Sequence, residues 1–221
     1  MTDSTGEDTE ALVAALLDRY GTTYGEELGI DLARNTPSAL FRWLCASILM
    51  SARISSENAM RAAKALADAG WTTAERMAAS TREERVSVLN ANGYARYDES
   101  TARMLGEDAG MLLGKYDGDL RKLREKAGGE PAALRALLKA FKGIGDVGAA
   151  IFCREAQAAW GELYPFADRK ALSSAKKLGL PDDAESLSKL VCTTEFPRLA
   201  AALVRCDLAN DHDAVRNAAE M

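Results

Sequence analysis

Three closely spaced glycines mark the stretch of this chain that is best suited to chemistry. They lie in residues 142–150, KGIGDVGAA, between two segments with helical character. Gly143 and Gly145 can adopt positive φ, and Ile144 between them can insert where two helices meet. We expect Asp146 to cap the second helix. The segment therefore predicts a tight helical hairpin.

A hairpin this short exposes the backbone N–H groups at the start of its second helix. Those groups have no partner inside the helix, so a helix N-terminus favours anions. Gly148 and Ala149 leave room for a phosphodiester, and Lys142 adds a positive charge. Such a contact positions a protein on DNA without reading its sequence. The plainer alternative is an ordinary helical turn that ends in a glycine cap.

The hairpin and a segment that follows it resemble a known family. The pattern GIGxxGA at residues 143–149 is followed, one helix later, by YPFADR at residues 164–169. Together they resemble the helix-hairpin-helix (HhH-GPD) DNA glycosylase superfamily, which includes endonuclease III, and the resemblance covers roughly residues 38–180. In that family an aspartate at the start of the next helix is catalytic, and Asp168 matches its place.

Asp168 has a structural and a catalytic interpretation, and the two are compatible. An aspartate that opens a helix is an ordinary N-cap, whose side chain accepts a backbone N–H. Such a carboxylate stays ionised at neutral pH. At the mouth of a cleft it can stabilise the oxocarbenium-like sugar that forms as an N-glycosidic bond breaks, and it can orient the attacking water. The resemblance implies this role for Asp168.

The residue at the position of the family's nucleophile is aliphatic. Bifunctional members carry a lysine two residues after the second hairpin glycine, and its amine forms a Schiff base with the sugar. Val147 stands at that position here. We therefore expect a monofunctional glycosylase that leaves an abasic site. Lys170 lies close to Asp168 but matches no nucleophile of the family.

Base excision requires that the target nucleotide leave the stack and that a side chain fill the gap. Arg53 lies where relatives of endonuclease III carry an intercalating glutamine, and an arginine there is similar to the mismatch-specific members. Its guanidinium can stack and can hydrogen-bond an orphaned guanine. A surface arginine at a helix end is the plainer explanation.

Four aromatic residues are candidates for a pocket wall, although core packing explains them equally well: Tyr94, Tyr97, Tyr164 and Phe166.

The charge distribution fits DNA binding only in part. The net charge of −5 argues against an indiscriminate nucleic-acid binder. Residues 135–177 carry a net charge of +4, whereas residues 1–40 carry −6. The positive segment includes the hairpin and Asp168, unless it is simply a solvated face. Asp146 is discordant, because a carboxylate beside a phosphate weakens the contact unless its oxygens cap the helix.

The cysteines and the one histidine show no metal-binding pattern. Cys45, Cys153, Cys192 and Cys206 occur singly, and His212 stands in a polar tail. Many relatives of endonuclease III carry a four-cysteine iron–sulfur loop near the C-terminus, which the wide spacing of the last two cysteines does not match. We expect buried or free thiols, no iron–sulfur cluster and no other metal or cofactor. The resemblance alone allows a monovalent cation at the hairpin.

The elements that position these residues are predicted to be helical throughout. Apolar residues recur at helical spacing ahead of the hairpin, at Leu134, Leu137, Leu138 and Phe141. No stretch alternates with period two, so we predict an all-α fold. The resemblance implies two lobes with a DNA-binding cleft between them. A six-helix barrel would span residues 38–159, with the helix-hairpin-helix at about 131–159, and residues 1–37 and 160–221 would form a lobe of terminal helices.

The sequence thus predicts a base excision repair enzyme that hydrolyses the N-glycosidic bond of a damaged or mispaired base, with Asp168 as the catalytic carboxylate. Val147 and Arg53 favour deaminated or mismatched pyrimidines over alkylated purines. Two other classes stay open: a non-catalytic helix-hairpin-helix protein that recognises DNA structure, and an all-α scaffold that never binds DNA.

The expected partner is double-stranded DNA with a lesion or mismatch, and we expect a monomer. No apolar run approaches the ~20 residues of a membrane helix, so we expect no membrane contact. The first five residues are polar, unlike a signal sequence. A cytoplasmic location follows as an expectation, with nucleoid association if the source is prokaryotic.

Overall fold

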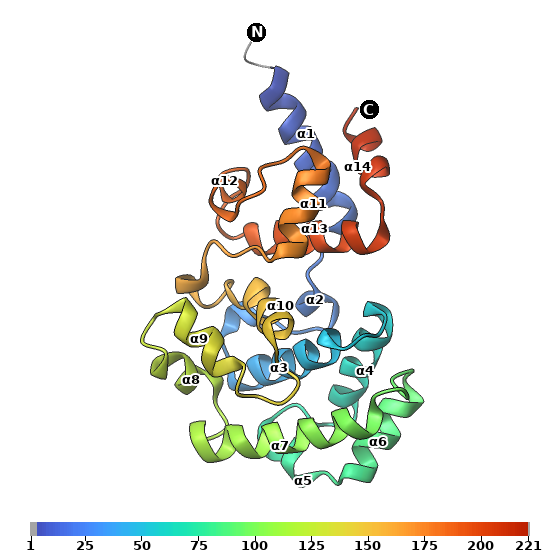
Figure 1. Cartoon of the computed structure of the whole chain (residues 1–221), viewed down its shortest axis with the longest axis vertical. Coiled ribbons are helices and arrows are strands. Elements are labelled where there is room, and N and C mark those ends of the chain that lie inside the picture. The colour runs from blue at the N-terminus through green and yellow to red at the C-terminus, as the bar shows by residue number, and fades with distance from the viewer. Residues whose placement is uncertain (1–3, 221) are drawn as a thin grey trace. The chain divides into compact units, whose positions relative to one another are not determined.

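The structure, a computed structural model, describes residues 4–220. Within these residues the regular structure is helical and contains no strand, which confirms the predicted all-α class. The chain divides into two compact units (Figure 1). We call Leu28–Glu162 the central unit, and the residues up to Glu27 together with those from Leu163 the terminal unit.

The central unit carries the hairpin and is built around one apolar helix. Its elements are η1 (Leu32–Arg34), α3 (Pro37–Ser51), α4 (Ser56–Asp68), α5 (Ala74–Ala79), α6 (Arg82–Ala91), α7 (Asp98–Tyr116), α8 (Leu120–Lys126), α9 (Pro131–Leu138) and α10 (Asp146–Ala156). Several of these helices begin at a side chain that accepts a backbone N–H of the first turn, as expected for N-caps: Thr36, Ser55, Thr73, Thr81 and Asp119.

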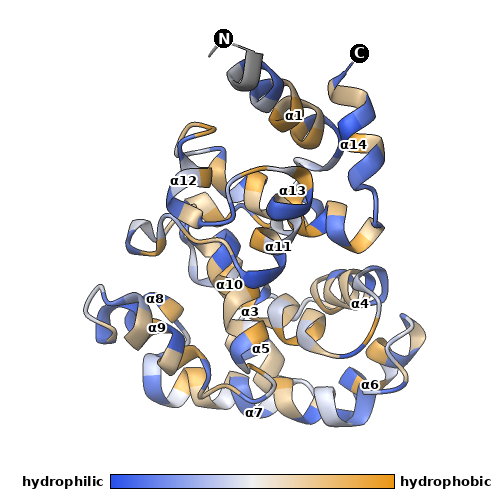
Figure 2. Cartoon of the chain, turned by 45° about the horizontal axis from the view of Figure 1, so that its top comes forward, coloured by the Kyte–Doolittle hydropathy of each residue, from blue (hydrophilic) through white to orange (hydrophobic). Residues whose placement is uncertain are grey.

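Helix α3 lies in the middle of the central unit and is mostly apolar (Figure 2). It packs against α4 on one side and α10 on another. Trp43 links α3 to α10 directly, because its indole N–H donates to the carbonyl oxygen of Phe152 at 3.0 Å. Ten of its fifteen residues are buried, as expected of a core helix. It therefore gives the hairpin a fixed support.

The terminal unit contains the helix that Asp168 opens. Its helices are α1 (Ser4–Tyr20), α2 (Tyr24–Glu27), α11 (Arg169–Leu178), α12 (Ala184–Ser188), α13 (Phe196–Ala209) and α14 (His212–Ala219), and the short turn η2 (Gly161–Leu163) lies at the boundary of the units. Helix α13 packs against α1 and α11. Its long buried face supplies the core of this unit.

The prediction that His212 lies in a polar tail is wrong, because His212 belongs to a helix that packs within the terminal unit. His212 begins α14 and is buried, and its Nε2 lies 3.0 Å from the hydroxyl oxygen of Ser174 on α11. Val215, one turn later, is buried on the same face. The segment is polar overall, but one side of the helix packs against α1 and α11.

None of the described helices is both long enough and apolar enough to cross a bilayer.

Candidate functional site

In the hairpin between α9 and α10, Gly143 and Ile144 have the local geometry that the sequence predicts. Gly143 has a φ of +78°, and the N–H of Ile144 donates to the carbonyl oxygen of Phe141 at 3.2 Å. The side chain of Ile144 is only 4% exposed, so it does insert into the core. Gly145 differs from the expectation. As the N-cap residue of α10 it has a φ of −93°, in the extended region.

The hairpin is fixed to the last turn of α3. A methyl group on Gly143 would lie 3.1 Å from the Cγ2 atom of Ile48 and 3.2 Å from the Sδ atom of Met104, so only glycine fits without movement of its neighbours. The hydroxyl oxygen of Ser51 lies 3.0 Å from the carbonyl oxygen of Gly143 and 2.8 Å from that of Ile48, so its one proton is shared between the hairpin and α3. Gly143 is therefore required both by its positive φ and by the close approach of two helices.

Asp146 does not cap α10, contrary to the prediction. Gly145 occupies the N-cap position and Asp146 is the first helical residue. The carboxylate of Asp146 is 91% exposed and accepts a hydrogen bond of 2.8 Å from the Nζ atom of Lys139. This hydrogen bond lowers the pKa of Asp146, so the group is anionic at neutral pH. The N-cap of α10 therefore contributes no side-chain hydrogen bond to the first turn of the helix.

The first turn of α10 has one exposed and one packed side. Val147 is 64% exposed. Gly148 and Ala149 are buried, and a methyl group on Gly148 would lie 3.4 Å from the Cβ atom of Ser51. The small residues therefore serve helix packing as well as access to the backbone, while Val147 is the side chain that a ligand at this turn would meet.

Arg53 lies on the same end of α3 as the hairpin. It is exposed at the tip of a tight turn, in which the N–H of Ile54 donates to the carbonyl oxygen of Ala52 at 2.9 Å. Ser51, which bonds to the hairpin, precedes it by two residues. The structure thus brings together Arg53 and the hairpin, although they are far apart in sequence. Lys142 is exposed at the hairpin as well.

The aromatic candidates have different environments. Tyr94 is 0% exposed, and its hydroxyl group donates to the carbonyl oxygen of Leu49, so it belongs to the core and does not line a pocket. Tyr97 is half-buried, 6.4 Å from the Tyr94 ring by centroids, with the Arg96 guanidinium 5.3 Å from its own ring centroid. Tyr164 packs edge-on against Phe196 in the terminal unit, and Phe166 is half-buried.

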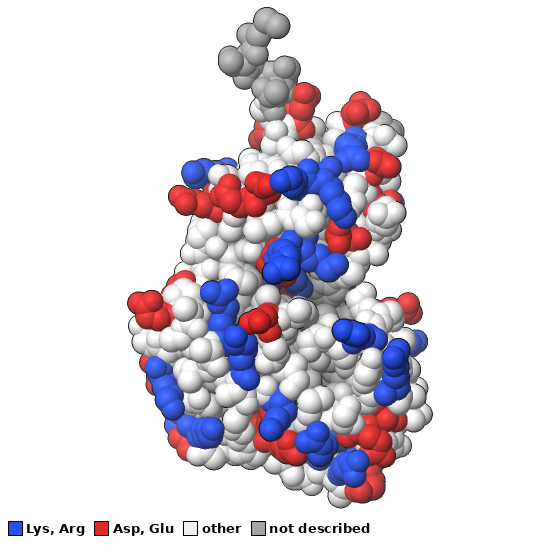
Figure 3. Space-filling model, viewed as in Figure 1, with Lys and Arg blue, Asp and Glu red and all other residues white. Residues whose placement is uncertain are grey.

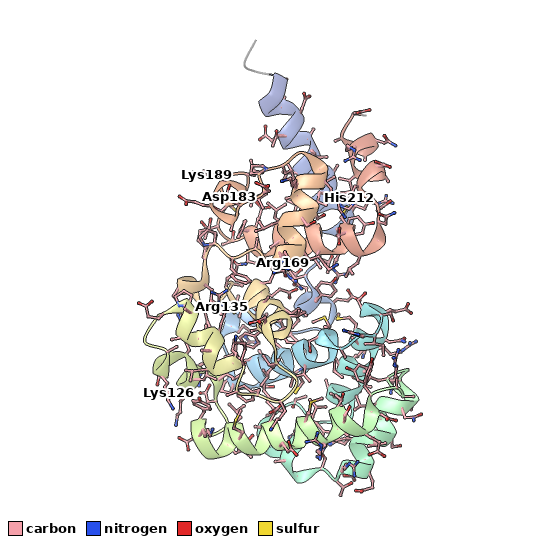
Figure 4. All side chains as sticks on the ribbon, viewed as in Figure 1. Lys126, Arg135, Arg169, Asp183, Lys189 and His212 are labelled. Atoms are coloured by element: carbon pink, nitrogen blue, oxygen red, sulfur yellow. The ribbon has the colours of Figure 1, made fainter. Side chains whose placement is uncertain are left out.

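Asp168 is the N-cap of α11, as predicted. Its Oδ1 atom accepts the backbone N–H groups of Lys170 at 2.9 Å and Ala171 at 3.0 Å. The residue is half-buried, and Arg169, labelled in Figure 4, follows it at the start of the helix. These two bonds fix the carboxylate at the positive end of the helix dipole.

Lys170 is engaged elsewhere in the terminal unit. Its Nζ atom lies 3.1 Å from Oδ2 of Asp207 on α13, and Lys177 binds the other oxygen of the same carboxylate at 2.7 Å. The two lysines lie two turns apart on α11, so one acidic residue holds both ends of that helix face. This arrangement keeps α11, and with it Asp168, in place against α13.

The sequence reasoning missed Asp108, a buried acidic residue that contacts the hairpin. Its side chain on α7 is 3% exposed, and its Oδ1 atom accepts the backbone N–H of Lys142 at 2.6 Å. Burial raises the pKa of Asp108 to about 7. The helical spacing could have indicated this burial, because Asp108 lies three residues after Leu105 and four before Leu112, on the buried face of α7.

On the one face of the central unit that is drawn in Figure 3, the basic side chains do not form one continuous patch. Lys and Arg of the central unit are spread out there and interleaved with Asp and Glu. Arg135 on α9, labelled in Figure 4, lies near enough to Asp146 to lower the pKa of its carboxyl, as Lys139 does more strongly.

Metal-binding groups are not gathered at the hairpin. Within residues 4–220 no cluster of three or more His, Cys, Asp or Glu could hold a metal ion. Cys45, Cys153 and Cys206 are buried and Cys192 is exposed, all as free thiols. Three carbonyl oxygens of the turn, those of Phe141, Gly143 and Gly145, already accept hydrogen bonds. The monovalent cation stays a prediction of the resemblance.

No family model and no curated protein matches the sequence. Among solved structures, a trapped covalent intermediate of endonuclease III with DNA is similar at 19% sequence identity and a TM-score of 0.47, over 74% of this chain and 71% of that one.

Proposed function

We propose that this protein is a monofunctional DNA glycosylase of base excision repair. In this proposal the hairpin of the central unit binds the sugar-phosphate backbone, and Asp168 activates water and stabilises the oxocarbenium-like transition state at a flipped nucleotide. The two units would correspond to the helical barrel and the terminal-helix lobe that the family resemblance implies.

The observation that carries the proposal is the hairpin itself. Gly143 takes a conformation that favours glycine, Ile144 fills the core, and the N-cap of α10 makes no side-chain hydrogen bond to the first turn. Backbone N–H groups at such a helix start are suited to phosphate oxygens. The attachment of the hairpin to α3 supports its use as a rigid contact that needs no ordering on binding.

Asp168 supports the catalytic part of the proposal. Its Oδ1 atom accepts two backbone N–H groups, which fix the side-chain rotamer. A preorganised anion of this kind suits a transition state that develops positive charge on the sugar. The exposed aliphatic side chain of Val147 supports the monofunctional assignment, because it offers no amine for a Schiff base.

Arg53 suggests which bases are removed. It is exposed near the hairpin, and a guanidinium can pair with the orphaned guanine left by a mismatched or deaminated pyrimidine. We therefore propose G·T and G·U pairs as the first substrates to test. A panel of duplexes that also contains thymine glycol, 8-oxoguanine and alkyladenine would identify the base.

The decisive experiment measures abasic-site formation on this panel with the wild-type protein and Asp168→Asn. Asparagine is as good an N-cap as aspartate, so the fold and DNA binding should persist while base excision falls by at least about a hundredfold. Asp183→Asn is the matched control, since Asp183 caps α12 in the same way and should keep full activity. Borohydride should trap no covalent adduct.

Full activity of Asp168→Asn would overturn the catalytic assignment. A borohydride-trapped adduct would contradict the monofunctional assignment while leaving a glycosylase in place.

The alternative is a non-catalytic helix-hairpin-helix protein that recognises DNA structure. The exposed anionic Asp146 beside the hairpin favours it, because this charge opposes tight phosphate contact. Binding to branched or damaged duplexes without abasic-site formation on any of them would support this alternative.

A further inference from the structure

Asp108 carries a buried carboxyl group in contact with the hairpin. Its Oδ1 atom accepts the backbone N–H of Lys142, while its Oδ2 atom is buried and accepts no hydrogen bond from the described residues. A carboxylate has acceptor capacity for several bonds, and buried polar atoms without a partner are uncommon. The Oδ2 atom therefore calls for a physical explanation.

The hydrogen bond from the Lys142 N–H to Asp108 fixes the residue at which the hairpin begins. Lys142 immediately precedes Gly143, whose carbonyl oxygen is held by Ser51 of α3. Met104, one turn before Asp108 on α7, lies in contact range of Gly143 as well. Two consecutive residues of the hairpin are thus held by two different helices. Of the three side chains that make these contacts, Asp108, Ser51 and Met104, only Asp108 can change its charge.

The carboxyl group of Asp108 changes its charge near neutral pH. Burial raises the pKa of its carboxyl to about 7, against the lowering effect of the Lys142 N–H bond. The titratable and charged groups that face it come from each neighbouring element: Cys45 of α3, Glu107 of α7 and Lys142 of the hairpin. Glu107 raises the pKa and Lys142 lowers it. Both the neutral and the ionised form of Asp108 are therefore populated.

We propose that Asp108 is a positioning residue of the hairpin and that it takes up a proton from solvent when a DNA phosphate binds there. This inference rests on the proposed function, because it takes the hairpin as the phosphate site. A bound phosphate adds negative charge beside a buried carboxylate, and like charges repel strongly where water is scarce. A proton on Oδ2 removes that repulsion, while Oδ1 keeps its bond to Lys142.

Linkage makes the effect reciprocal. If phosphate binding favours the protonated form, then protonation favours phosphate binding by the same factor. DNA affinity should therefore fall as the pH rises through neutrality, beyond any change that the rest of the protein causes.

The test measures the Kd of the full chain for an undamaged duplex oligonucleotide from pH 5.5 to 8.5 at constant ionic strength. We expect the wild-type affinity to fall roughly two- to fivefold between pH 6 and pH 8, which corresponds to a rise in the pKa of Asp108 by about half a unit to one unit on binding. Asp108→Asn cannot titrate and should show a nearly flat profile. Glu107→Gln, the matched control on the preceding residue of α7, removes an exposed charge but leaves Asp108 able to titrate. It should keep the fall in affinity, shifted to slightly lower pH because Glu107 raises the pKa of Asp108.

The outcomes separate this inference from the proposed function. Binding by the wild type with an equally steep profile in Asp108→Asn would overturn the inference alone. Absence of binding at every pH would overturn both. If circular dichroism shows that Asp108→Asn does not fold, ¹³C NMR titration of the wild-type Asp108 carboxyl with and without duplex decides: its pKa should rise on binding, and an unchanged value would overturn the inference.

Discussion

Three aspartates show how strongly the role of a residue depends on its place in a helix. Asp168 stands one residue before α11 and caps it, so its carboxylate is fixed by backbone N–H groups. Asp146 is the first residue of α10 itself and not its N-cap, so its carboxylate binds Lys139 and does not cap the helix. Asp108 lies on a buried helix face and loses water without gaining a full set of partners. The same side chain thus serves as a cap, an exposed anion and a titrating buried acid.

At the hairpin, Asp146 should weaken DNA binding. Asp146→Asn removes an exposed negative charge from the first turn of α10 and releases Lys139 toward a phosphate. We expect the affinity for duplex DNA to rise roughly two- to fivefold at low salt, with a steeper salt dependence. Fluorescence anisotropy at several salt concentrations measures both quantities.

The matched control is Asp182→Asn, because Asp182 is also exposed and also pairs with a lysine, Lys176, but lies in the terminal unit. An equal gain in affinity for both variants would mean that only net charge matters.

At the scale of elements, α3 is the support on which the candidate DNA-contacting segments depend. Its last turn holds the hairpin through Ser51 and Ile48, and it continues directly into the turn that carries Arg53. The Tyr94 hydroxyl group also bonds to this end of α3, at Leu49. A change in the packing of α3 should therefore move the hairpin and the Arg53 turn together.

Gly143→Ala tests the contact between α3 and the hairpin. The positive φ of Gly143 alone should cost about 1–2 kcal/mol, and contacts of the new methyl group with Ile48 and Met104 should add about 1 kcal/mol. Gly128→Ala is the matched control, since Gly128 also has a positive φ but a methyl group there would meet no neighbouring atom within 4 Å. Urea unfolding should show a larger loss for Gly143→Ala. Equal losses would mean that α3 does not constrain the hairpin.

At the scale of the whole molecule, the acidic character of the chain belongs to one unit. The terminal unit has 16 Asp and Glu against 9 Lys and Arg, a net charge of −7, whereas the central unit has 17 against 19, a net charge of +2. The overall charge of −5 therefore understates how well the hairpin-bearing unit suits a polyanion.

The free energy of unfolding should depend on pH through Asp108. Its pKa is raised from 3.8 to about 7 in the folded protein, so its stabilising contribution is complete below pH 3.8 and is lost as the pH rises to about 7. Between pH 5 and pH 8 the wild type should lose roughly 2–3 kcal/mol relative to Asp108→Asn. Thermal or urea unfolding of both proteins across this range measures the difference. Parallel pH profiles would show that Asp108 does not titrate in this window.

The sequence by itself determined most of the helices, the turn at Gly143 and the capping role of Asp168. These features depend on contacts within a few residues, such as the bonds from Lys170 and Ala171 to Asp168, and on glycine's tolerance of positive φ at Gly143. Local hydrogen bonds and local sterics act in the same way wherever the segment lies. For this reason they can be inferred from neighbouring residues alone.

Only the tertiary structure decided the fate of the residues whose partners are distant in sequence. Lys142 and Asp108 are 34 residues apart, Ser174 and His212 are 38 apart, and Tyr94 and Leu49 are 45 apart. Burial and hydrogen bonding across such separations depend on which helices pack together, and the periodicity of a single helix does not specify its neighbour. The core position of Tyr94, the helix at His212 and the titrating acid behind the hairpin therefore emerged only from the packed fold.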